Sequence, residues 1–291
     1  MALIPAGSFT MGDALLDNGN NANFSEELPI RDVYVSAFYV DRYEVTQALW
    51  DRVKLWNDGN GYTYDNPGSS KGPSHPIQSM NWFDAVKWCN ARSQMEGRTP
   101  CYYTDITLTN VFKTTLAFPF SVPYVNWSAK GYRLPTEAEW EKAARGGATG
   151  RRFAWSEGDT ITQDRANYFS FWQDGVADIF YDLNPTEGFH PNFQFGDLPY
   201  TSPGGSFSPN GYGVYDAVGN VTEWCWDWFG KYPNGAQTDP NGPALGELRV
   251  MRGGNWNSEP STSRMASRNS RPPGNFTNAR VGFRTVLPAI Q

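Results

Sequence analysis

The chain has 291 residues, a formal net charge of −6 and no cluster of Lys or Arg, so the electrostatic footprint of a nucleic-acid-binding or membrane-surface protein is absent. Its 29 Gly, 21 Pro and only 19% charged residues indicate many turns and few long amphipathic helices. The 12 Trp, 15 Tyr and 18 Phe offer enough apolar surface for a packed core, which argues against disorder.

The N-terminal third is predicted to contain a strand followed by two helices. Residues 31–40 alternate between polar and apolar side chains, which is typical of a strand. A helix begins after Thr46, which can cap it, and its apolar residues recur three and four positions apart. A second helix begins after Asn81, and the helical spacing of its apolar residues predicts that Cys89 is a core thiol.

A third helix is predicted after Thr136. Thr136 and Glu139 have the spacing of a capping box, and the glycines at 146–147 end the helix. Four later segments are predicted to be short strands of a small antiparallel sheet joined by glycine turns: 214–215, 220–224, 248–252 and 281–286. Three long segments between the elements lack periodicity, as functional loops often do: 57–80, 97–130 and 148–212. The predicted class is α+β, with one domain over residues 1–291.

Cysteine and hydropathy patterns say little about the compartment. Cys89, Cys101 and Cys225 are too few for a disulfide framework and leave at least one free thiol. No apolar run approaches 18 residues, so no transmembrane helix is expected. No signal-peptide pattern precedes the strand-like segment at the start of the chain.

Several short motifs occur in order along almost the whole chain. They occupy residues 4–12, 43–46, 75–77, 81–82, 132–141, 210–216, 218–224, 252–254 and 282–284. Together they resemble the formylglycine-generating (sulfatase-modifying factor) family, which has a C-type-lectin-like fold. The resemblance implies an α+β, C-type-lectin-like domain with much irregular structure and a small antiparallel sheet.

The chemistry of this family is only partly matched. Its oxidases hold copper with a cysteine pair just after the Gly-Gly motif, whereas this chain has Ser258 at the first position and no cysteine in 259–263. A hydroxyl cannot replace a thiolate as a ligand for Cu(I), so no copper is expected. A related branch uses iron held by histidines. His75 and His190 are too few for a three-histidine site, although a carboxylate could complete a facial triad. The copper oxidase or a related enzyme remains the alternative function.

The C-terminal segment also resembles the variable region of diversity-generating-retroelement target proteins, which use the same lectin-like fold. The resemblance implies a non-catalytic, receptor-like monomer at the cell surface or outside the cell, whose ligand is a protein or a glycan. Its variable segment would span about 252–284, on a frame of Arg252–Gly254, Trp256, Arg264, Ala266, Arg268, Asn275 and Gly282–Arg284. The predicted contact positions lie between frame residues: Asn255, Asn257, Ser258, Glu259, Ser261, Thr262, Ser263, Ser267, Asn269, Ser270, Arg271, Phe276 and Asn278.

Simpler readings of the same residues stay open. The frame arginines are expected to be structural and to bind loop carbonyls through their forked donors. Trp256 is expected to belong to the core or frame. The polar run at 257–263 could be an ordinary solvated loop of a scaffold protein. Phe276 could anchor a ligand or pack inward.

The family resemblance also implies structural calcium. Asp216 and Glu223, with the carbonyls of Gly219 and Val221, match one calcium site of the family, and oxygen donors of this mixed kind suit Ca²⁺. Asn167 and the carbonyl of Tyr168 could belong to a second site. The alternative is that the two carboxylates bind loop amides.

Overall fold

The computed structural model describes residues 1–15, 26–57, 59–115, 122–171, 180–274, 278 and 280–289. The helices begin where the sequence predicts, as α1 (Gln47–Asn57), α2 (Trp82–Met95) and α3 (Glu137–Arg145). Thr46 Oγ1 accepts the Leu49 amide at 3.4 Å, and the Asn81 side chain accepts the Asp84 amide at 2.8 Å. At α3 both bonds of the capping box form, and Gly146 follows the helix with a left-handed φ of 58°.

The strands form small sheets, in which few neighbouring strands are consecutive in the sequence. One three-stranded sheet has the order β1 (Ala2–Ile4), β4 (Phe38–Val40), β12 (Val286–Pro288), and another has the order β2 (Gly7–Met11), β3 (Arg31–Val35), β8 (Gln237–Thr238). The four-stranded sheet has the order β10 (Asn269–Arg271), β9 (Arg249–Arg252), β7 (Thr222–Trp228), β11 (Val281–Gly282). A separate pair joins β5 (Tyr102–Tyr103) to β6 (Tyr124–Val125).

Three strand predictions need correction. The predicted strand at 31–40 is two strands, because the chain leaves the β2–β3 pair at residues 36–37 and enters the sheet of β1 and β12. The predicted strand at 281–286 is likewise divided into β11 and β12, which belong to different sheets. Residues 214–215 form no strand, since the Tyr215 amide donates instead to the carbonyl of Arg42.

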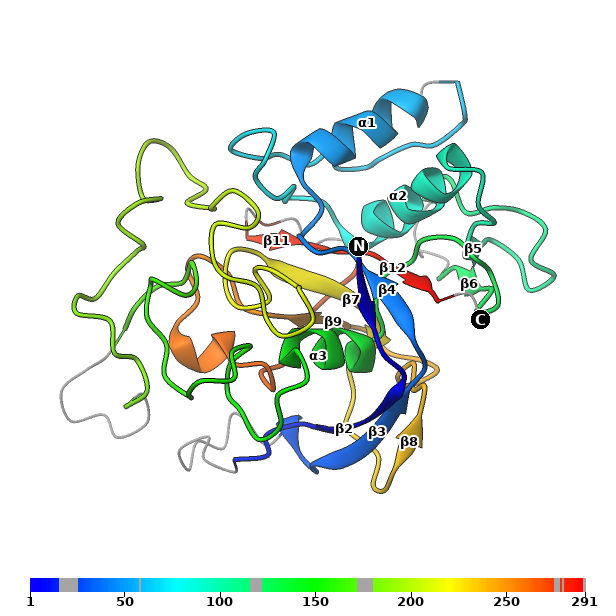
Figure 1. The fold of residues 1–291 in the computed structure, drawn as a ribbon. Coiled ribbons are helices and arrows are strands. Elements are labelled where there is room, and N and C mark those ends of the chain that lie inside the picture. The colour runs from blue at the N-terminus through cyan, green and yellow to red at the C-terminus, as the bar shows by residue number, and fades with distance from the viewer. Residues whose placement is uncertain are drawn as a thin grey trace.

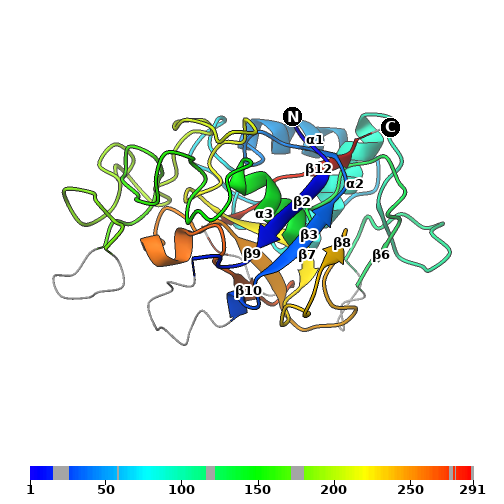
Figure 2. The same cartoon turned by 60° about the horizontal axis from the view of Figure 1, so that its bottom comes forward.

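The layers meet around α3. This helix contacts β2 and β3 on one side and β7 and β9 on the other, as Figures 1 and 2 show. Helices α1 and α2 pack against the other part of the core, where the rings of Trp50 and Trp88 stack 5.9 Å apart and both contact Phe283. Cys89 is fully buried there, which confirms the predicted core thiol.

The long segment predicted at 148–212 contains no helix or strand among its described residues, and it surrounds a small core of its own that includes Phe153, Tyr168 and Tyr181. It lies to one side of the four-stranded sheet, next to the short 3-10 helix at Pro260–Ser263 (Figure 1). None of the helices in the described part of the chain has the length and apolar composition needed to cross a membrane.

Candidate ligand-binding surface

The predicted variable segment leaves the four-stranded sheet at the end of β9 and returns to it as β10. The two strands are antiparallel, with Asn269 opposite Met251 and Arg271 opposite Arg249. A turn at Gly253–Gly254 starts the excursion, and both glycines have positive φ. A Cβ on Gly254 would lie 2.5 Å from Ser263 Oγ, so the chain can close on itself here only without a side chain.

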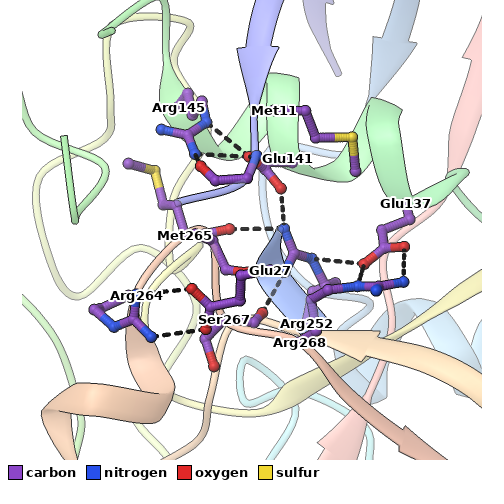
Figure 3. A network of polar contacts seen from close by, with 12 residues as sticks. Met11, Glu27, Glu137, Glu141, Arg145, Arg252, Arg264, Met265, Ser267 and Arg268 are labelled. Carbon is purple, nitrogen blue, oxygen red and sulfur yellow. Dashed lines mark hydrogen bonds and ion pairs between the residues drawn. The ribbon is translucent and has the colours of Figure 1, made fainter. Parts of the chain in front are cut away.

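Arg252 holds the excursion from below. Its side chain is 1% exposed and donates to the carbonyls of Met265, at 2.7 Å, Ala266, at 2.8 Å, and Ser267. It also bonds to the carboxylate of Glu141 on α3. One guanidinium therefore joins three consecutive carbonyls of the loop to the central helix (Figure 3).

Two further arginines of the loop form bidentate ion pairs in the interior. Arg264 donates to both oxygens of Glu27, at 2.9 and 2.7 Å, and Arg268 donates to both oxygens of Glu137, at 2.7 and 2.8 Å (Figure 3). Although burial opposes it, the charges of Arg268 and Arg252 lower the pKa of Glu137. These pairs fix both ends of the 264–268 stretch.

Arg284 completes the frame beneath the sheet. It bonds to both oxygens of Glu223, at 2.7 and 2.6 Å, and Trp140 Nε1 donates to the same carboxylate at 2.9 Å. The prediction that the frame arginines are structural and bind carbonyls is confirmed for all four: Arg252, Arg264, Arg268 and Arg284. The sequence had not indicated their carboxylate partners, which are distant along the chain.

Most interleaved side chains lie at the surface, above this ionic frame. Glu259, Thr262, Asn269 and Arg271 are exposed. The half-buried positions are Asn255, Asn257, Ser258, Ser261, Ser270 and Asn278. Phe276 lies outside the described residues.

Two predicted contact positions are wrong. Ser263 is 0% exposed, and its hydroxyl donates to the carbonyl of Glu259 at 3.1 Å. Ser267 is 6% exposed, and its carbonyl is one of those bound by Arg252. Neither side chain can reach a ligand, because one closes the Gly-Gly turn and the other lies over the buried guanidinium.

Asn255 and Ser258 also shape the turn. The Asn255 amide donates to Ser258 Oγ at 3.0 Å, and the Asn255 side chain bonds to Thr222 and to the amide of Asn257. Ser258, which stands at the first copper-ligand position of the oxidase pattern, therefore has a hydrogen-bonding role that its hydroxyl can fulfil. We place these two residues at the edge of the contact surface.

An aromatic cluster borders the loop, and sequence reasoning missed it. Trp256 is 2% exposed, as its frame assignment predicts, and its ring contacts Phe189 and Tyr200 at centroid distances of 5.7 and 5.4 Å. Phe169 stacks edge-on against Phe189, and its amide donates to the Ser258 carbonyl at 3.0 Å. The half-buried rings of Phe169, Phe189 and Tyr200 come from the aperiodic segment at 148–212. The length of that segment was its only sequence indication of a functional role.

The groups that could carry redox or nucleophilic chemistry are inward-facing or bonded. All three cysteines are free and buried, and burial raises the pKa of Cys101 to about 11 and the pKa values of Cys89 and Cys225 well above their usual value. His75 Nδ1 lies 3.0 Å from Thr201 Oγ1, and His190 Nε2 lies 2.7 Å from the carbonyl of Gln163.

The predicted calcium ligands fit an ion only in part. Asn167 and Asp216 each bury a side-chain oxygen that has no hydrogen-bond partner, as a missing cation would leave them. Burial raises the pKa of Asp216 to about 6. Within the described ranges, no three His, Cys, Asp or Glu side chains gather as a metal site.

Two members of the predicted calcium set have hydrogen-bond partners within the protein. Both oxygens of Glu223 are used by Arg284, and the Tyr168 carbonyl accepts from Gln163 at 3.1 Å. Gly219 lies beside Asn167, to which it is bridged, and the amide of Val221, which is not the predicted ligand atom, donates to Glu44. The unpaired oxygens of Asn167 and Asp216 are the side-chain atoms that support the calcium prediction, and the carbonyl ligands stay a prediction.

Comparison with known proteins gives a family match, relatives in sequence and a similar solved structure. The family model for the sulfatase-modifying factor enzyme 1-like domain matches residues 1–289. The formylglycine-generating enzyme of Streptomyces coelicolor is 33% identical over 98% of this chain and 88% of its own length, and the chaperone protein LppX of Paenibacillus barcinonensis is 32% identical over 95% and 89%. Among solved structures, Treponema denticola variable protein 1 superposes with a TM-score of 0.70 and 28% identity, over 99% of this chain and 95% of that one.

Proposed function

Because the chain belongs to the family of sulfatase-modifying factor enzyme 1-like domains, we propose that it uses this scaffold as a non-catalytic binding protein with a diversified C-terminal surface. The ligand is a protein or a glycan met at the cell surface or outside the cell. Similarity to Treponema denticola variable protein 1 supports this reading of the scaffold.

The observation that carries the proposal is the separation of frame from surface in the loop. Arg252, Arg264 and Arg268 are tied to buried carboxylates, while exposed side chains such as Glu259 and Thr262 make few bonds that the fold needs. A surface of this kind tolerates substitution, because its conformation is determined by groups beneath it. Rigid support under variable side chains is also how antibody paratopes combine stability with diversity.

The competing hypothesis is the copper-dependent oxidase, which the Streptomyces coelicolor relative favours. Against it, no cysteine occurs at 258–263, and the thiols of Cys89, Cys101 and Cys225 are buried with raised pKa values. A peptide with a sulfatase-type cysteine motif, incubated with the protein, Cu(I) and oxygen, tests this directly. Aldehyde formation above the protein-free background would reject the binding proposal in favour of the enzyme.

A display experiment tests the binding proposal itself. One library randomises six surface positions of the loop: Asn257, Glu259, Ser261, Thr262, Asn269 and Arg271. A matched library randomises six exposed positions elsewhere: Asn234, Ala236, Asn241, Ala244, Leu245 and Glu247. Both are selected against hen egg-white lysozyme as the probe.

We expect the loop library to stay folded and to yield lysozyme binders with Kd values of about 1 µM or lower, and the matched library to yield none. Melting curves of random, unselected members measure folding. Widespread loss of folding in the loop library, or equal yields from the two libraries, would contradict the proposal.

A further inference from the structure

A cavity lies beneath the edge of the sheets, outside the predicted contact positions. It has a volume of about 300 Å³ and opens between the start of α3, the beginning of β3 and the loop that follows β7. Its lining includes Arg31, Asp227, Trp228, Lys231 and Tyr232. Of the frame residues that the structure describes, only Arg268 lines it.

Arg31 is the unusual residue of this cavity. Its side chain is 8% exposed, yet Nε and Nη1 have no hydrogen-bond partner. Nη2 lies 3.5 Å from the sulfur of Met11, and the guanidinium lies over the ring of Tyr232 at 3.9 Å. No carboxylate of the described residues forms an ion pair with it, although a buried charge is costly unless it is paired.

The other charged groups around the cavity leave it suited to an anion. Glu137 is ionised and paired with the fork of Arg268. Burial, and then the charge of Glu137, raises the pKa of Asp227 to about 8, so this carboxyl group is mostly protonated at pH 7. Lys231 is exposed at the rim, while the first amide of α3, from Glu137, is already bound by Asp227 Oδ2 at 2.8 Å.

The size and walls restrict the anion further. A volume of about 300 Å³ is at the lower end for small-molecule sites. Trp228, Tyr232 and Pro243 supply apolar wall surface, which suits a compact apolar or aromatic body. One unpaired guanidinium matches a single negative charge, whereas a phosphate dianion would need a second free cation in the interior.

We propose that this cavity binds a small monocarboxylate, with the carboxylate on Arg31 and the apolar body against Trp228 and Tyr232. The site is separate from the loop surface and does not depend on its diversification. The unpaired guanidinium is then the counterpart of a ligand, and the folded protein bears its cost in the ligand-free state.

Isothermal titration calorimetry of the full chain tests the proposal with three probes in a carboxylate-free buffer. Phenylacetate carries the predicted charge and body, phenylacetamide has the same shape without the charge, and inorganic phosphate has charge without the body. We expect phenylacetate to bind about tenfold or more tightly than phenylacetamide, since a hydrogen bond to a charged group typically contributes at least this factor. Phosphate should bind more weakly than phenylacetate.

Two variants and a control identify the residues involved. Arg31→Met should abolish the preference for the acid and leave the melting temperature unchanged or raised, because it removes an unpaired buried charge. Lys231→Met, at an exposed position, should weaken phenylacetate binding a few-fold without affecting folding. Arg165→Met, which removes a surface arginine paired with Glu157, should change nothing.

The comparison of acid with amide and the Lys231 variant remain decisive if Arg31→Met does not fold. Equal binding of phenylacetate and phenylacetamide would overturn the proposal, as would tighter binding of phosphate than of phenylacetate. An undiminished affinity in folded Arg31→Met, or no phenylacetate binding by the wild type, would do the same.

Discussion

Replacing Arg252 with methionine should release the predicted binding loop from the rest of the molecule. In the folded protein this guanidinium binds Glu141 and the carbonyls of Met265, Ala266 and Ser267, all in the interior. Methionine fills a similar volume but offers no donor. The substitution therefore isolates the polar contribution of Arg252 from its packing.

The size of the effect follows from what remains after the substitution. Removing one partner of a buried ion pair typically costs about 3–5 kcal/mol. Glu141 keeps Arg145 at 2.7 Å and the Gly12 amide at 2.9 Å, which favours the lower end of that range. The carbonyls that lose their donor add about 1 kcal/mol or more. A total of about 4 kcal/mol corresponds to a fall in Tm of about 6–7 °C for a chain of this size.

Thermal unfolding followed by circular dichroism measures this effect. Arg252→Lys provides a graded comparison, because an ammonium can keep the charge near Glu141 but cannot reach all three carbonyls. Its Tm should therefore lie between those of the wild type and Arg252→Met. Arg271→Met is the matched control at an exposed position of the same loop and should shift Tm by about 2 °C or less. A fall of less than about 3 °C in Arg252→Met would show that the loop does not depend on this residue.

Three further measurements follow from the buried groups. The folded-state pKa of Asp216, about 6, lies above its ordinary value of 3.8, so the free energy of unfolding should fall as pH rises from about 4 to about 6. Asp216→Asn should remove this fall. An unchanged pH profile in the variant would contradict the assignment of the fall to Asp216. Calcium should raise the Tm of the wild type and not of Asp216→Asn, whereas identical melting curves in calcium and in EDTA would reject a bound ion. Cys89, Cys101 and Cys225 should react with a thiol reagent slowly in the native protein and rapidly in urea; a fast native reaction would mean that one of them is accessible.

Local sequence was sufficient for the helices and for the frame of the loop. The starts of the three helices, the caps at Thr46 and Thr136, and the Gly-Gly turn were predicted, because each depends on bonds or backbone angles within a few residues of the chain. The ordered motifs likewise predicted the family that the comparisons show. The absence of cysteine at 258–263 is a property of the sequence alone and argues against a thiolate copper site there.

Tertiary structure decided what those residues face. Arg264 and Glu27 are 237 positions apart, and Arg284 and Glu223 are 61 apart, so no local pattern could have paired them. The same pairing gives Glu223 a protein partner that the predicted calcium set did not include.

The division of the predicted strand at 31–40 between two sheets has the same origin, as does the burial of Ser263 within a polar run that the sequence assigned to the surface. A local pattern specifies which groups need partners. Only the packing of distant segments determines which partners they find, because burial and the strength of a buried ion pair depend on every neighbour that excludes water.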